Sequence, residues 1–161
     1  MLLATAACSG SSAPANNTAA VSPSVSAPAS PAPGSLTAAQ VVANLKAAGL
    51  PIGTVTEYTK SSDPDHLLGS PNEYTSKVGF VDKDVPASEA AGQGGGISAG
   101  GAVEVFNTAA EATARKQYIL NAESSGQTST TEYDVINGAV LLRLSQDLTT
   151  KQVQAFATAL G

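Results

Sequence analysis

Three segments of the chain carry hydrophobic residues at helical spacing, and each of them opens with the same capping pattern. A threonine stands just before each segment, and a glutamine or glutamate follows it three residues later, as in a capping box. The pairs are Thr37 with Gln40, Thr108 with Glu111, and Thr149 with Gln152. The sequence therefore predicts three helices, of which the middle one covers about residues 109–122 and turns Ala110, Ala114 and Tyr118 to one side.

Alternating polar and apolar residues predict strands between these helices. The pattern indicates strands at residues 74–82 and 102–106 and a weaker one at 54–59. In the 74–82 strand, Tyr74, Val78 and Phe80 are expected to share a face.

A β-hairpin is the clearest strand signal and spans residues 131–145. At its centre, Asn137-Gly138 favours a type I′ turn, in which both turn residues need a positive φ. The register that follows pairs Glu132 with Arg143, Tyr133 with Leu142, and Ile136 with Ala139, and it places Tyr133, Val135, Val140, Leu142 and Leu144 on one face.

The predicted order of elements is α-β-β-β-α-β-β-α. The hairpin is antiparallel, and we expect the sheet to be mainly so, with the apolar face of the hairpin under the helices. We therefore expect an α+β fold, a two-layer sandwich with the helices on one face of the sheet.

Charge divides the chain into parts. Residues 1–45 contain no charged side chain, and the eight basic and 13 acidic residues all lie from Lys46 onward. Ser, Ala and Pro dominate residues 9–35, a composition that cannot bury enough apolar surface to fold and that predicts a disordered tether. Such a tether would span ~30 Å as a flexible coil and up to ~80 Å if extended. The globular domain is expected over residues 36–161.

The first residues suggest how this domain is held in place. Ala6-Ala7-Cys8-Ser9-Gly10 resembles the end of a bacterial lipoprotein signal peptide. The resemblance implies that Cys8 carries lipid and that residues 1–8 are the remnant of a signal peptide whose true start lies upstream of Met1, because seven residues are too few for a complete one. Two acyl chains would anchor the chain stably at the outer face of the cytoplasmic membrane.

Short motifs in residues 36–161 point to the same location. They are Asp63-Pro64-Asp65-His66-Leu67-Leu68-Gly69, Tyr74-Thr75-Ser76-Lys77, Val103-Glu104-Val105-Phe106, Glu132-Tyr133-Asp134, Leu141-Leu142-Arg143-Leu144 and Leu148-Thr149. Together they resemble small, secreted, functionally uncharacterised actinobacterial lipoproteins. The resemblance implies the same location and transfers no activity.

Composition excludes several classes of function. A net charge of −5 without clustered Lys or Arg argues against nucleic-acid binding. No apolar run approaches the ~18 residues of a membrane span. The single cysteine, Cys8, excludes a disulfide framework and a cysteine-based zinc site.

Asp63-Pro64-Asp65-His66 is the one place where carboxylates flank an imidazole. A metal site needs three or four converging ligands, which one local cluster rarely supplies. We therefore interpret the segment as an Asp-Pro turn that leads into a helical turn through Leu67 and Leu68. A catalytic or metal-binding role for His66 with Asp63 or Asp65 stays the alternative.

Three further segments have plain structural interpretations. Gly92–Gly101 precedes a strand rather than a helix, so a mobile loop over about residues 87–101 fits better than a phosphate site. Asp82-Lys83-Asp84 lacks the further ligands of a calcium loop and predicts a solvated strand end. Glu132 and Arg143, with Asp134 diagonal to them, predict a cross-strand ion pair on an exposed outer sheet face.

The sequence favours a non-catalytic binding or interaction module, tethered outside the cytoplasmic membrane, with no cofactor or metal. The expected contact regions are residues 61–73 and the sheet face with Glu132, Asp134 and Arg143. An envelope protein or a cell-wall component is the expected partner, in addition to the membrane reached through the lipid on Cys8. A small extracytoplasmic hydrolase or metal-binding protein that uses His66 is the alternative, and a purely structural spacer is a third interpretation.

Overall fold

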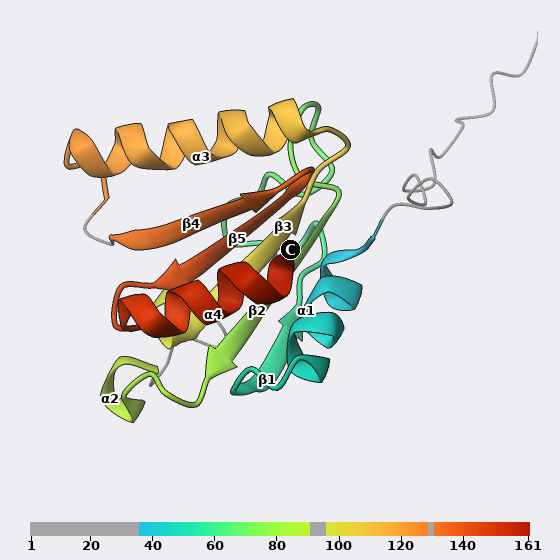
Figure 1. The fold of residues 1–161 in the computed structure, drawn as a ribbon. Coiled ribbons are helices and arrows are strands. Elements are labelled where there is room, and N and C mark those ends of the chain that lie inside the picture. Colours follow the sequence, from blue (N-terminus) through green and yellow to red (C-terminus); the bar gives the residue numbers. More distant parts are fainter. Residues whose placement is uncertain (1–35, 91–95, 129–130) are drawn as a thin grey trace, which may run out of the picture.

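A computed structural model describes residues 36–90, 96–128 and 131–161 (Figure 1). The helices are α1 (Ala38–Ala47), α2 (Ala87–Ala90), α3 (Ala109–Ser124) and α4 (Thr150–Leu160), with a 3-10 segment η1 (Ile97–Ala99). The strands are β1 (Ile52–Glu57), β2 (Ser76–Asp82), β3 (Gly100–Val105), β4 (Glu132–Asn137) and β5 (Val140–Ser145). The predicted α+β class is confirmed. The predicted order holds for the longer elements, with α2 and η1 as additional short segments between β2 and β3.

The three predicted capping boxes are present, so the N-termini of the long helices lie where the sequence placed them. At α3, the Thr108 hydroxyl accepts a hydrogen bond from the Glu111 backbone N–H at 3.2 Å. The Glu111 carboxylate accepts one from the Thr108 backbone N–H at 2.9 Å. Each box satisfies two backbone donors that a helix start leaves without partners.

The five strands form one antiparallel sheet in the order β1-β2-β3-β5-β4. The central strand β3 begins with two glycines that the sequence placed in a loop. A Cβ atom on Gly100 would lie 2.3 Å from the backbone nitrogen of Asp82, and one on Gly101 would lie 2.5 Å from the Arg143 carbonyl oxygen. These glycines therefore permit close approach of the neighbouring strands. Residues 91–95 of the predicted loop lie outside the described ranges.

The β4–β5 hairpin has a different register from the predicted one. Asn137 pairs with Val140, so Gly138 and Ala139 form the turn, and Asp134 rather than Glu132 lies directly opposite Arg143. Gly138 has a φ of +55°, whereas Asn137 and Ala139 do not have positive φ. This is the pattern of a type II′ turn, which needs glycine only at its first central position. Because the shift moves each partner by two residues, the predicted apolar face is unchanged.

The helices do not all lie on one face of the sheet, and that part of the prediction is wrong. α1 and α4 cover one face, where the main core contains Val78, Phe80, Val103, Leu142 and Phe156. α3 and residues 58–75 cover the other, where a smaller core contains Leu68, Tyr74, Phe106, Ile119 and Leu141. Figure 1 shows β4 and β5 between α3 and the pair α1 and α4. The side chains of the adjacent residues Leu141 and Leu142 point to opposite sides of the sheet. Each face of the sheet therefore has apolar residues that can pack against a covering layer.

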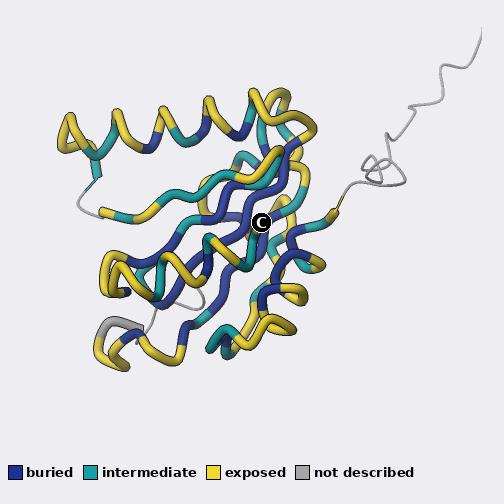
Figure 2. Tube along the Cα trace, in the orientation of Figure 1, coloured by how far each residue is buried: buried dark blue, intermediate teal, exposed yellow. Residues whose placement is uncertain are grey.

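Two predictions of shared faces fail because of this second layer. Tyr74 precedes β2 and packs in the smaller core, away from Val78 and Phe80. On α3, the predicted side with Tyr118 is exposed, and the buried residues are Ala112, Arg115 and Ile119. Figure 2 shows α3 exposed along most of its outer side, whereas buried residues are concentrated on the strands. The prediction placed the wrong side of α3 inward because it counted apolar residues only, and one of the buried residues, Arg115, is charged.

Cys8 and the predicted tether, residues 9–35, lie outside the described ranges. None of the helices in residues 36–90, 96–128 and 131–161 is both long and apolar enough to cross a bilayer.

Candidate functional site

A cluster of charged side chains lies between the sheet and its second layer. Lys77 on β2 is the direct cross-strand partner of Glu104 on β3. Arg143 on β5 and Arg115 on α3 both donate hydrogen bonds to this glutamate, at 3.0 and 3.3 Å. All four residues are mostly or fully buried, and Glu104 is completely inaccessible. Charges that are removed from water must be paired, which explains why three cations converge on one buried carboxylate.

Asp63, which lies in residues 58–75, is a further member of this cluster. Its carboxylate is fully buried and accepts hydrogen bonds from the backbone N–H groups of Leu67 and Leu68, at 2.9 and 3.0 Å. It also accepts from the Tyr74 hydroxyl at 2.7 Å and from Lys77 Nζ at 3.1 Å. Burial by itself would raise the pKa of Asp63, but these hydrogen bonds and the Lys77 charge outweigh it and lower the pKa to about 2. Asp63 therefore fixes the fold of its own segment.

Asp65 is the accessible member of the cluster, with 36% of its side chain exposed. Its Oδ2 accepts hydrogen bonds from Lys77 Nζ and from Arg115 Nη2, the latter at 3.0 Å. Partial burial would raise the pKa of Asp65, but the bond from Lys77 and the nearby cations lower it. Asp65 is therefore an ionised carboxylate held in one position at the surface.

Arg143 and Glu132 form the predicted ion pair, but not on an exposed face. Two nitrogens of Arg143 donate to the two carboxylate oxygens of Glu132, at 2.7 and 2.9 Å. The two side chains are only 12% and 3% exposed, because the second layer lies over this part of the sheet. Burial would lower the pKa of Arg143, but the hydrogen bonds that it donates to Glu132 and the charge of Glu104 raise it. The pair is thus part of the cluster.

Asp134 lies opposite Arg143 without sharing in these contacts. Both of its carboxylate oxygens are buried and have no hydrogen-bond partner in the described part of the chain. Lys116 Nζ instead donates to the backbone oxygen of Asp134, at 2.6 Å. Burial, and secondly the charge of Glu132, raise the pKa of Asp134 to about 7. Because Arg143 donates its hydrogen bonds to Glu132 and none to Asp134, the ionised form of the Asp134 carboxylate is unfavourable.

A cavity of about 660 Å³ opens above the cluster. Its lining includes Pro64, Asp65, Arg115, Tyr118, Glu132 and Arg143. A smaller hollow of about 350 Å³ shares Leu67, Arg115 and Tyr118 with it and also includes Asn72, Glu73 and Glu111. The volumes lie in the range of small-molecule sites. The two regions that the sequence proposed for a contact, residues 61–73 and the sheet face of Glu132 and Arg143, meet at this cavity.

His66 is exposed and adopts a positive φ of 57°. Asp63 faces the protein interior, where its oxygens already bond to Leu67, Leu68, Tyr74 and Lys77. Within the described ranges no group of three His, Cys, Asp or Glu residues is placed to hold a metal ion. The predicted helical turn through Leu67 and Leu68 is a series of turns without helix. No contact observed here favours the catalytic or metal-binding alternative for His66.

Asp82 was predicted at a solvated strand end, but it is buried. Its Oδ1 accepts a hydrogen bond from the backbone N–H of Asp84 at 2.8 Å. Asp84 in turn accepts one from the Gln152 side chain of α4 at 2.9 Å. Burial raises the pKa of Asp82, and the charge of Asp84 adds to this effect. The segment therefore joins the end of β2 to α4.

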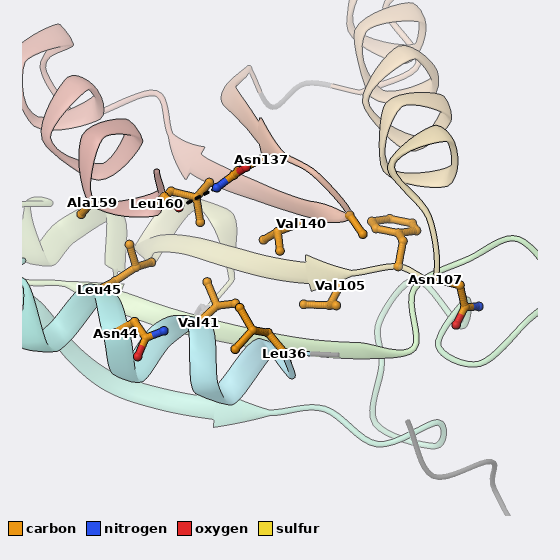
Figure 3. Close-up of a pocket in the computed structure, with 12 residues that line it drawn as sticks. Leu36, Val41, Asn44, Leu45, Val105, Asn107, Asn137, Val140, Ala159 and Leu160 are labelled. Carbon is orange, nitrogen blue, oxygen red and sulfur yellow. Dashed lines mark hydrogen bonds between the residues drawn. The ribbon is translucent and has the colours of Figure 1, made fainter. Parts of the chain in front are cut away.

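A second pocket, of about 380 Å³, lies between α1 and α4 on the opposite face of the sheet (Figure 3). Its walls are mainly aliphatic and include Leu36, Val41, Leu45 and Val140. At one side Asn137 Nδ2 donates a hydrogen bond to the Leu160 carbonyl oxygen at 2.8 Å, which satisfies the end of α4. Asn44, Asn107 and Asn137 also line the pocket, which is a gap at the margin of the main core.

The sequence identified Asp63, Asp65, Glu132 and Arg143 but missed Lys77, Glu104 and Arg115. Lys77 and Glu104 occupy polar positions in alternating strands, which normally face solvent. The one available signal was Leu141, together with Ile136, on the same face as these charges. Apolar residues on the face that carries Lys77 and Glu104 indicate that another part of the chain covers this face.

Comparisons with protein-family models, with curated proteins and with solved structures find no match.

Proposed function

We propose that this chain is a non-catalytic binding module of the bacterial cell envelope, anchored by lipid on Cys8 to the outer face of the cytoplasmic membrane. The observation that carries the binding role is the position of Asp65. Its carboxylate is accessible from a cavity of about 660 Å³, yet it is held by Lys77 and Arg115. Rigid polar groups at an open cavity lose little entropy when they bind a ligand.

The proposal of a non-catalytic role rests on how the charged groups are used. Glu104 and Glu132 are paired with arginines, and the Asp63 carboxylate accepts five hydrogen bonds. A general acid or base needs a proton that it can exchange near neutral pH within reach of a substrate. Asp63 and Asp65 instead have lowered pKa values, and Asp134, whose pKa is raised to about 7, has both carboxylate oxygens buried. The cluster is therefore suited to hold a fixed pattern of charge.

The anchoring role is supported by the sequence. Ala6-Ala7-Cys8-Ser9 is followed by residues without charge up to Lys46. A long uncharged segment between the lipid and the domain would let the cavity reach partners away from the membrane surface.

The anchor is tested by mass spectrometry and fractionation of the full chain made in its own host. The expected result is a chain that begins at Cys8, carries acyl groups and is extracted from membranes only by detergent. A Cys8→Ser variant should appear in the soluble fraction, whereas Ser9→Ala, the matched control, should stay with the membrane. A soluble native chain with an unmodified thiol would overturn the proposed anchoring.

A further inference from the structure

We propose that the cavity beside Tyr118 binds a neutral oligosaccharide, in a groove with two subsites that meet at the Arg115–Tyr118 pair. This proposal rests on the binding role proposed above and gives the ligand a chemical class.

The groove is longer than a single cavity. The hollows of about 660 and 350 Å³ share Leu67, Arg115 and Tyr118, so they adjoin at these residues, with the exposed Tyr118 as the ridge between them. On one side the ligand would meet Asp65 and the exposed Gln127, and on the other Asn72 and Glu111. Polar side chains on both sides of a shared ridge suit a linear polar ligand with repeating units.

Tyr118 supplies the feature that points to a sugar ring. It is 62% exposed, and the Arg115 guanidinium lies 5.6 Å from its ring centroid. That cation–π contact helps to hold the ring in place while most of it stays in water. An aromatic face carries partial negative charge, which attracts the polarised C–H groups of a pyranose ring. A tyrosine held beside polar groups is therefore a stacking platform for a saccharide.

Arg115 and Asp65 supply the hydrogen bonds. All contacts of Asp65 with the described residues fall on Oδ2 or its backbone, so Oδ1 is available as an acceptor. Arg115 is only 7% exposed, but it lines both hollows. It uses two N–H groups, toward Glu104 and Asp65, of the five that a guanidinium offers. An acceptor and several donors next to each other match adjacent hydroxyl groups, each of which both donates and accepts.

The charge balance favours a neutral ligand. The cations Lys77, Arg115 and Arg143 are already paired with Asp63, Asp65, Glu104 and Glu132. A charged ligand would lose its hydration without finding an unpaired countercharge. The surplus of one carboxylate also repels anions. An extended peptide fits less well, since the two edge strands of the sheet, β1 and β4, do not supply the shared ridge of the groove.

The test is titration of the full chain, labelled with ¹⁵N and followed by NMR, with three kinds of probe. The probes are two neutral tetrasaccharides (tetra-N-acetylchitotetraose and mannotetraose), a tetragalacturonate as the anionic counterpart, and an uncharged, end-capped Gly-Ser hexapeptide. We expect a neutral tetrasaccharide to shift the resonances of Asp65, Asn72, Arg115 and Tyr118 together, and the other two probes to leave them unchanged.

Variants then separate stacking from fold. Tyr118→Ala should weaken binding by about tenfold, whereas Tyr118→Phe should retain it within about threefold because the ring remains. Tyr133→Ala is the matched control, since Tyr133 is an exposed tyrosine outside both hollows. Equal thermal midpoints of the Tyr118 variants would show that the fold is intact.

Three results would overturn the proposal. They are the absence of binding by both neutral tetrasaccharides at millimolar concentration, binding by the hexapeptide or the uronate at the same residues instead, and equal losses for Tyr118→Ala and Tyr133→Ala. None of them bears on the lipid anchor, which the mass of the native N-terminus tests separately.

Discussion

Arg115, in the middle of α3, donates a hydrogen bond from Nη2 to Oδ2 of Asp65 at 3.0 Å, across 50 residues of sequence. The same side chain reaches Glu104 on the central strand through Nε at 3.3 Å. One residue thus connects α3, residues 58–75 and the sheet. The second layer depends on this contact because its apolar core is small.

Replacement of Arg115 should therefore destabilise the whole fold. In Arg115→Gln the buried Glu104 keeps Arg143 and Lys77, but it loses one of its three cations. We expect a loss of about 2–4 kcal/mol in the free energy of unfolding, since breaking a buried ion pair leaves a charge uncompensated. Urea denaturation measures it. Lys151→Gln, at an exposed position of α4, should change the stability by less than about 0.5 kcal/mol. Similar effects of both variants would contradict the role given to Arg115.

Asp63 should make the fold sensitive to acid. Its pKa is lowered from 3.8 to about 2 in the folded chain, so the unfolded chain binds the proton more readily. The stabilisation from Asp63, about 2 kcal/mol, is present above pH 4 and is lost as the pH falls toward 2.

Unfolding free energies at several pH values between 5 and 2 test this, within the acid range set by the pKa of Asp63. Asp63→Asn should be less stable than the native chain at pH 5, and the difference should shrink toward pH 2. Glu57→Gln, at an exposed position of β1, is the control for the loss of a carboxylate elsewhere in the chain. A constant difference between Asp63→Asn and the native chain would show that the Asp63 charge is not stabilising.

The helices could be predicted from the sequence because their signals are local. Each capping box lies within four residues, and Thr37, Thr108 and Thr149 all cap as expected. The placement of α3 depends instead on contacts between distant segments. Val103 and Glu104 follow the apolar-polar alternation of a sheet with one face exposed to solvent. Only the position of α3 shows that the face with Glu104 is covered.

The candidate site was predictable in part for the same reason. The sequence indicated Asp63 and Asp65 as candidates because His66 follows them. Their ion pairs are instead with Lys77 of β2 and Arg115 of α3. No local pattern links Lys77 to Asp63, 14 residues earlier, or Arg115 to Asp65. The sequence identified carboxylates whose role only the tertiary structure reveals.

The hairpin turn gives a sharp test of backbone conformation. Gly138 has a φ of +55°, whereas Asn137 is an ordinary strand residue. Gly138→Val should cost about 1–2 kcal/mol, since a β-branched residue strongly disfavours positive φ. Ala139→Ser, at the second turn position, should cost less than about 0.5 kcal/mol. Thermal or urea unfolding of the two variants measures the difference, and equal costs would contradict the type II′ turn.

Asp134 should oppose folding at neutral and alkaline pH. Its pKa is raised from 3.8 to about 7, because burial and the charge of Glu132 disfavour the ionised form more than Arg143 and Lys116 favour it. The folded chain therefore holds a proton that the unfolded chain has released. From this group alone, stability is highest below pH 4 and falls as the pH rises toward 7.

Asp134→Asn removes that effect while it keeps the shape of the side chain. We expect the variant to be more stable than the native chain by about 1–2 kcal/mol at pH 8, a gain reduced by the amide's own need for hydrogen bonds. The gain should disappear near pH 4, where native Asp134 is protonated. Asp147→Asn, at an exposed position after β5, is the control for the same substitution elsewhere in the chain. A gain that does not change with pH would mean that Asp134 is ionised in the fold, with Lys116 and Arg143 compensating its charge.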